Sequence, residues 1–131
     1  MISRRAIDYI IQAVDAEEDA AISEHGMFHS DHEAWAVLKE EVEELVELFD
    51  EDKLYVDLDK LWNKVRKNQK IKNSDVEEIY NWAKSCAEEA VQVMAMIYKW
   101  GDSNEQRKQE KSGFRGDEAA EDDRGGAHAG V

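Results

Sequence analysis

The sequence has no proline and little glycine, and both scarcities bear on the fold class. Of its 131 residues seven are glycine, and six of these lie at or after position 101. Residues 1–100, with Gly26 as their one glycine, are therefore poor in the residues that turns require. All-β and α/β architectures need many turns, so the sequence predicts an all-α fold of long helices joined by few loops.

Cysteine and long hydrophobic runs are also scarce. Cys86 is the single cysteine, which excludes an intramolecular disulfide and a cysteine-based zinc site within one chain. We identify no signal peptide and no apolar run long enough to cross a membrane. The expectation is a cytoplasmic protein with no membrane partner.

Basic residues are outnumbered by acidic ones. The chain has 31 Asp and Glu against 17 Lys and Arg, which gives a formal net charge of -14. This balance argues against binding to nucleic acid or to anionic membranes, and it suits a protein that gathers cations with its carboxylates. A weaker alternative is that the acidic surface mimics nucleic acid and occupies a DNA-binding protein.

Hydrophobic spacing predicts a bundle of about four helices in a domain over residues 1–100, and a flexible, disordered tail over residues 101–131. The expected helices cover approximately residues 4–23, 31–50, 57–68 and 74–100, and Gly101 is expected to close the last one. The last helix is expected to be roughly 40 Å long, and three shorter helices alone cannot bury a helix of that length. We therefore expect self-association into a homo-dimer or a larger homo-oligomer.

The expected caps and core positions of these helices follow from short motifs. Ser3 and Ser30 are expected N-caps, and Ser74 begins a further capping-box pattern. The helical spacing of the large apolar residues in the second helix predicts that they face the core. These residues are Trp35, Leu38, Val42, Leu45 and Phe49.

The densest functional signal is the acidic run at residues 40–45 (Glu-Glu-Val-Glu-Glu-Leu). On a helical wheel Glu41 and Glu44 lie on one flank of the apolar stripe, and Glu89 and Gln92 lie on an edge of the last helix. If the two helices pack antiparallel, these edges meet and can hold a divalent metal, Mg²⁺ best and Mn²⁺ as an alternative. A solvated, Glu-rich helix face is the alternative interpretation.

These residues resemble the E-E-x-x-E-L signature of the MazG-like all-α nucleoside triphosphate pyrophosphohydrolases. The family's metal site uses an E-x-x-E on one helix, matched by Glu41 and Glu44, and an E-x-x-D on a later helix, where Glu89 matches the Glu. Gln92 stands where the family has Asp, which removes one negative charge and weakens the site for Mg²⁺. Residues 28–38 and 89–96 also resemble small phage and prophage proteins that carry the same E-x-x-Q pattern.

The resemblance implies Mg²⁺-dependent hydrolysis of a nucleoside triphosphate, either NTP or dNTP, to the monophosphate and pyrophosphate. A phage-encoded enzyme of this kind would maintain the nucleotide pool in the host cytoplasm. Glu33 or Glu40 would accept the proton of the attacking water. The alternative, which Gln92 favours, is a catalytically inactive, self-associating module that binds a nucleotide or a protein. The implied metal ligands are Glu41, Glu44, Glu89 and Gln92.

Three further residues are candidates for binding substrate. His32 adjoins Glu33 at the start of the second helix, where a capping or solvent-facing role is the alternative. Lys64 and Lys67 belong to a basic cluster that could hold phosphate groups. The same cluster could instead balance the acidic helices and complement a helix C-terminus.

Overall fold

The computed structural model describes residues 1–117, which form four α-helices and no strand. In chain order these are α1 (Arg4–His25), α2 (Asp31–Glu47), α3 (Glu51–Arg66) and α4 (Asn73–Asp117). The prediction of an all-α fold is therefore confirmed. Residues 118–131, part of the predicted tail, lie outside the described residues. No helix in the described part is long and apolar enough to cross a membrane.

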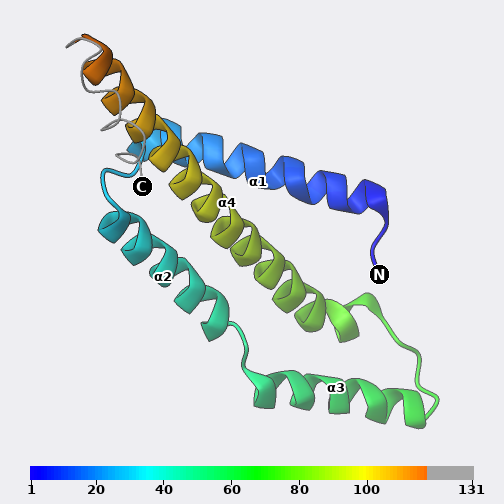
Figure 1. Ribbon diagram of the computed structural model, residues 1–131. Coiled ribbons are helices and arrows are strands. Elements are labelled where there is room, and N and C mark those ends of the chain that lie inside the picture. Colours follow the sequence, from blue (N-terminus) through cyan, green and yellow to red (C-terminus); the bar gives the residue numbers. More distant parts are fainter. Residues whose placement is uncertain (118–131) are drawn as a thin grey trace.

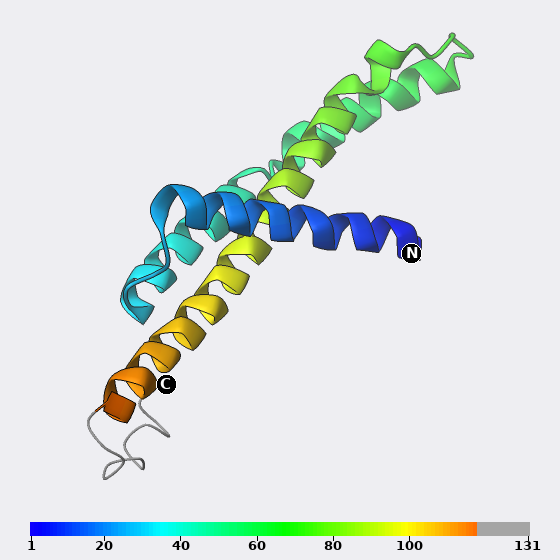
Figure 2. The same ribbon diagram turned by 90° about the horizontal axis from the view of Figure 1, so that it is seen from above.

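The long helix α4 lies at the centre of the arrangement, and the other helices are placed along it (Figure 1). Its 45 residues extend about 68 Å at roughly 1.5 Å per residue. Each of the other three helices packs against α4, and within residues 1–117 no other pair of helices packs together. Helix α2 runs alongside α4 in the opposite direction, whereas α1 crosses α4 obliquely (Figure 2).

Local capping explains where the first three helices begin. Ser3 Oγ accepts a hydrogen bond from the Ala6 N–H, and Ser30 Oγ accepts one from the Glu33 N–H, each at 3.1 Å, so both predicted N-caps are confirmed. Helix α3 begins at Glu51, several residues before the predicted start. The reason is the Asp50 carboxylate, which accepts the backbone N–H of Lys53 at 3.1 Å and caps the helix there.

The prediction that the last helix ends at Gly101 is wrong, because α4 continues to Asp117. Residues 101–117 are therefore helical, although the sequence assigned them to the tail. Ser103 is fully buried, and its hydroxyl accepts the Phe28 N–H at 2.8 Å and donates to the Lys99 carbonyl at 2.7 Å. The residues after Gly101 thus contact the α1–α2 connection. This packing stabilises α4 at a position where glycine lowers the helix propensity.

The beginning of α4 also differs slightly from the sequence prediction. The helix starts at Asn73, so Ser74 lies inside it and does not occupy the N-cap position. The Asp75 carboxylate accepts the backbone N–H of Lys72 at 2.8 Å, which satisfies a donor just before the first turn. One of the two hydrogen bonds of a capping box is therefore present, and it begins at Lys72 and not at the predicted Ser74.

The hydrophobic core is small and lies where α1, the α1–α2 connection, α2 and α4 meet. Helix α3 contributes no buried residue to it. Partly buried apolar side chains surround this centre, among them Leu38 and Trp100. The buried hydrophobic residues are Val14, Phe28, Ala34, Ala95 and Met96.

Helix α2 is turned relative to the predicted core stripe. Trp35 and Phe49 remain 56% and 59% exposed in the single chain, and Val42 is exposed as well, so their predicted core position is wrong there. Ala34 is buried instead, and Glu41 is half-buried. This rotation turns the flank that carries Glu41 toward α4 and leaves Trp35, Val42 and Phe49 at the surface.

Candidate metal centre and adjoining pocket

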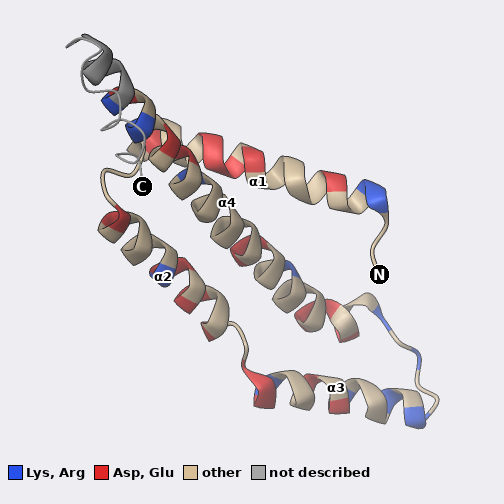
Figure 3. Ribbon diagram, in the orientation of Figure 1, with Lys and Arg blue, Asp and Glu red and all other residues tan. Residues whose placement is uncertain are grey.

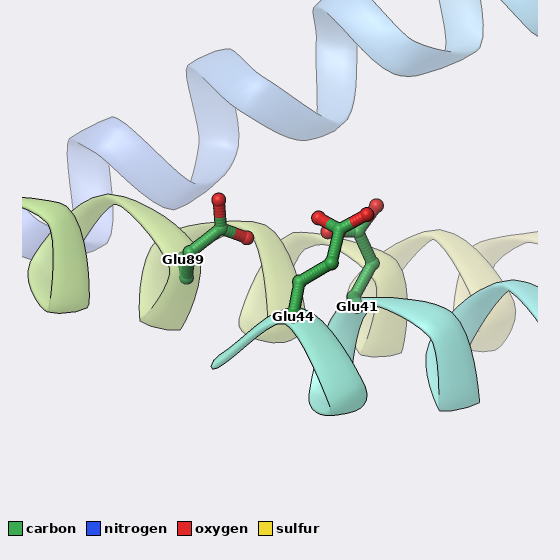
Figure 4. A group of neighbouring side chains, drawn as sticks. All are labelled: Glu41, Glu44 and Glu89. Atoms are coloured by element: carbon green, nitrogen blue, oxygen red, sulfur yellow. The ribbon is translucent and has the colours of Figure 1, made fainter. Parts of the chain in front are cut away.

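Three carboxylates meet between α2 and α4. Glu41 and Glu44 lie one helical turn apart on α2, and Glu89 comes from the facing helix α4. One carboxylate oxygen from each lies within 4.8 Å of the others. The three side chains rise on the same side of the two helices, toward α1 (Figure 4). The antiparallel packing of α2 and α4 thus brings together three of the four predicted metal ligands.

The electrostatics of this cluster are unfavourable without a cation. Burial and the neighbouring carboxylates of Glu44 and Glu89 raise the pKa of Glu41 above its ordinary value. Burial, followed by the charge of Glu44, raises the pKa of Glu89 in the same direction. Oε2 of Glu41 and Oε2 of Glu89 are buried, and within residues 1–117 neither has a hydrogen-bond partner. Such groups usually have a partner in a folded protein.

This donor set fits a hard divalent cation. Mg²⁺ and Mn²⁺ prefer carboxylate oxygens, and a cation would neutralise the repulsion and satisfy the two unpartnered oxygens. The fourth predicted ligand, Gln92, follows Glu89 by one turn of α4 and lines the same pocket as Glu41. Its amide can offer a neutral oxygen only, so the site has one negative charge fewer than a four-carboxylate site.

A pocket of about 540 Å³ adjoins the cluster and is lined by α1, the α1–α2 connection, α2 and α4. Its volume lies within the range of small-molecule sites, roughly 300–1,000 Å³. Glu41 and Gln92 line the pocket on the side of the cluster, while Phe28, Met96 and Lys99 line it further along. The pocket therefore joins a candidate metal centre to a partly apolar chamber.

Glu33 lines this pocket, but at a distance from the cluster. It lies eight residues before Glu41 on the same helix, or roughly 12 Å along the axis. Its carboxylate accepts the His29 backbone N–H at 3.2 Å, and this bond, with the nearby imidazole, lowers its pKa. The side chain thus helps to fix the start of α2, and it is not adjacent to the three carboxylates.

The remaining two candidates on α2 lie on its exposed side. Glu40 is exposed, and its charge contributes to the raised pKa of Glu41. His32 is exposed at the first turn, where its charge helps to lower the pKa of Asp31. Neither Glu40 nor His32 lines the pocket beside the cluster.

Within one chain, Lys64 and Lys67 are not brought to the carboxylate cluster. They lie near the end of α3, in the basic region that adjoins the start of α4 (Figure 3). Both line a separate pocket, and Lys64 Nζ donates to Asp75 Oδ1 at 2.5 Å. This ion pair joins α3 to α4, which favours the interpretation of these lysines as charge-balancing residues.

Two pocket residues were not identified from the sequence. Glu17 of α1 lines the pocket, and its charge helps to raise the pKa of Glu41. Lys99 of α4 is buried, with its ammonium 4.2 Å from the centroid of the Phe28 ring. Neither belongs to a recognisable motif. Only the crossing of α1 over α4 and the course of the α1–α2 connection place them beside the acidic run.

Comparisons with known proteins found no significant match. This holds for protein-family models, for curated proteins and for solved structures. The MazG-like resemblance of the acidic motifs therefore remains a prediction, and the site is interpreted from its geometry.

Proposed function

We propose that this protein is a Mg²⁺-dependent nucleoside triphosphate pyrophosphohydrolase of the MazG-like type. The observation that carries the proposal is the cluster of Glu41, Glu44 and Glu89 at one end of a nucleotide-sized pocket. The antiparallel arrangement of an E-x-x-E helix against the helix that carries Glu89 supports it. A role in nucleotide-pool maintenance, as the phage-like motifs suggest, belongs to the same proposal.

The three carboxylates would hold the metal, with the Gln92 amide oxygen as a neutral ligand. Mg²⁺ bound there would neutralise charge on the triphosphate and supply Lewis-acid activation for water attack at a phosphorus. Glu17 would accept the proton of that water in preference to Glu33, because the charge of Glu17 acts on Glu41 whereas Glu33 lies about 12 Å along α2. Closure of the pocket by α1 would limit the access of bulk water to the reacting groups.

The decisive experiment measures pyrophosphate release from a panel of NTPs and dNTPs with and without Mg²⁺. We expect release by the wild type and a loss of at least 100-fold in Glu44→Gln, because an anionic ligand is removed. Glu43→Gln is the matched control, since Glu43 lies on the solvent side of α2 in an ion pair with Lys39. Equal release by wild type and Glu44→Gln, or none by either, would contradict the proposal.

A catalytically inactive nucleotide-binding module is the second candidate, and Gln92 is the observation that favours it. Three carboxylates and one amide give a weaker cation site than four carboxylates. Under this alternative the wild type binds nucleotides without releasing pyrophosphate. Gln92→Asp adds the missing charge and should then increase Mg²⁺ affinity and produce turnover.

We also propose that the protein acts as a homo-oligomer. Large apolar side chains are exposed on each of the helices, while only five hydrophobic residues are buried in the part of the chain that the structure describes. Ile10 and Ile11 on α1, Trp62 on α3 and Tyr80 on α4 are examples. Apolar exposure on this scale is unusual for a monomeric soluble protein and is typical of surfaces that associate.

A further inference from the structure

Lys99 is the one lysine or arginine among the described residues that line the pocket. Four acidic residues line the same pocket, among them Glu33 and Glu41. Lys99 is only 4% exposed, and the one carboxylate whose charge is seen to act on its ammonium within the described residues is that of Glu33. Lys99 Nζ lies over the face of the Phe28 ring, 4.2 Å from the ring centroid. An ammonium has three donors, and one that lines a pocket can offer them to the acceptors of a ligand.

The position of Lys99 along the pocket indicates which part of a ligand it would meet. Lys99 follows Gln92 by seven residues on α4, which separates them by roughly 10 Å along the axis. With the phosphates held at the carboxylate cluster, the nucleoside extends toward Lys99. The surrounding side chains of Phe28, Val37 and Met96 are apolar, which suits a flat heterocycle better than a further phosphate.

Glu33 completes the recognition chemistry at this end of the pocket. The opposite charges of Glu33 and Lys99 influence each other, and both residues line the chamber. Lys99 is nearly fully buried, whereas the Glu33 side chain is 45% exposed, so the donor lies deep and the acceptor lies nearer the rim. A base that enters with its exocyclic substituent first would therefore place that substituent at the Lys99 ammonium. The adjacent ring nitrogen would then lie at the Glu33 carboxylate.

We infer that Lys99 determines base specificity and that the pocket prefers bases with a lactam edge, such as guanine, uracil and thymine. Their exocyclic carbonyl oxygen accepts from Lys99, and the adjacent ring N–H donates to Glu33. Adenine and cytosine present an amino group to the ammonium, which places donor against donor. This inference rests on the proposed function for the location of the phosphates and adds the substrate's chemical class.

The test compares wild type with Lys99→Met for all five bases: guanine, uracil, thymine, adenine and cytosine. The Met side chain keeps an unbranched apolar stem against Phe28 and removes the donors, so the fold is expected to persist. Lys84→Met, on an exposed face of the same helix, is the matched control for the loss of charge. Calorimetry gives the affinity for each nucleoside monophosphate, and pyrophosphate release gives kcat/KM for each triphosphate.

We expect the wild type to prefer lactam bases by about 10- to 100-fold, the size of one charge-assisted hydrogen bond. Lys99→Met should abolish that preference, while Lys84→Met should retain it. A purely structural role for Lys99 predicts an equal loss for every base, and that result would overturn the inference. An unchanged base preference in Lys99→Met would overturn it as well.

The two proposals fail separately. If the wild type releases no pyrophosphate but binds monophosphates with a Lys99-dependent lactam preference, the hydrolase proposal fails and the specificity inference holds. If hydrolysis depends on Glu44 but base preference does not depend on Lys99, the hydrolase proposal holds and the inference fails. If neither binding nor hydrolysis is observed, both are wrong.

Discussion

Glu18 is an acidic side chain buried where α1 crosses α4. It is 7% exposed, and its Oε2 has no conventional hydrogen-bond partner within residues 1–117. Burial, followed by contact with the Asp102 carboxyl group, raises the pKa of Glu18 from 4.5 to about 7. A carboxylate next to Glu18 favours the protonated, neutral form of Glu18. The charges of Asp15 and Asp19 act in the same direction.

This environment makes stability depend on pH. Unfolded Glu18 ionises near its ordinary pKa of 4.5 and folded Glu18 near 7, so between these values the folded state binds more protons. Stability contributed by the protonated group is therefore lost as pH rises from about 4.5 to 7. Glu18→Gln resembles the protonated form and should raise the free energy of unfolding by roughly 1–3 kcal/mol at pH 8.

Urea unfolding of wild type and Glu18→Gln at pH 5 and pH 8 measures this effect. We expect a small difference at pH 5 and the full stabilisation at pH 8. Glu24→Gln makes the same charge change on α1 at a side chain that is 74% exposed, and it should have little effect at either pH. Destabilisation by Glu18→Gln at pH 8 would show that the ionised form is favoured in the folded protein.

Glu44 should lower the stability of the metal-free protein while enabling its stabilisation by Mg²⁺. Removing one charge from the cluster relieves repulsion, so Glu44→Gln should unfold at a higher temperature than wild type in EDTA. Added Mg²⁺ should raise the unfolding temperature of wild type by several degrees, because it binds the folded state, and should have little effect on Glu44→Gln. Equal responses of the two proteins to Mg²⁺ would contradict the assigned ligand role.

Residue spacing predicted part of this site and could not predict the rest. Glu41 and Glu44 are local partners on one helix, and the register of α2 against α4 makes Glu89 their neighbour. Glu17 and Lys99 lie far from the acidic run in sequence and carry no motif. Their proximity depends on how α1 crosses α4, a tertiary feature that helical periodicity does not encode.

At the scale of elements, local signals predicted helix starts better than helix ends. Ser3 and Ser30 act as caps through bonds within a few residues, which sequence reveals directly. The start of α3 differs from the prediction because Asp50, which the spacing places at the end of the preceding helix, caps α3 instead. The continuation of α4 depends on long-range hydrogen bonds, which spacing does not reveal: the Phe28 N–H donates to Ser103 Oγ, and Arg107 donates to the Phe28 carbonyl.

Gly101 distinguishes a continuous α4 from a helix that ends there. The site has open space for a Cβ, with no atom within 4 Å. In a continuous helix Gly101→Ala should stabilise the protein by about 0.5–1 kcal/mol, because alanine loses less backbone entropy. At a left-handed helix terminus the same change would destabilise it. Urea unfolding gives the sign of the change in stability, and Gln109→Ala, at an exposed position of the same helix, is a control whose effect should be smaller.

The small core and the exposed apolar side chains of the whole molecule limit the hydrophobic stabilisation of a single chain. A core of five hydrophobic residues offsets little of the conformational entropy lost on ordering four helices. Among the described helices, α4 alone packs against α3, and α3 buries no residue. Further burial of α1, α3 and α4 against a second copy would supply the missing hydrophobic stabilisation.

We therefore expect a solution mass of at least twice the 15.1 kDa of one chain. Ile10→Glu on α1 and Trp62→Glu on α3 should each shift the population toward monomer, because a charge on an apolar interface must be desolvated. Gln12→Glu adds the same charge to α1 at an exposed polar position and should leave the mass unchanged. Sedimentation equilibrium across a concentration series measures the masses. A wild type that remains monomeric at micromolar to millimolar concentration would show that the apolar faces do not join copies of this chain.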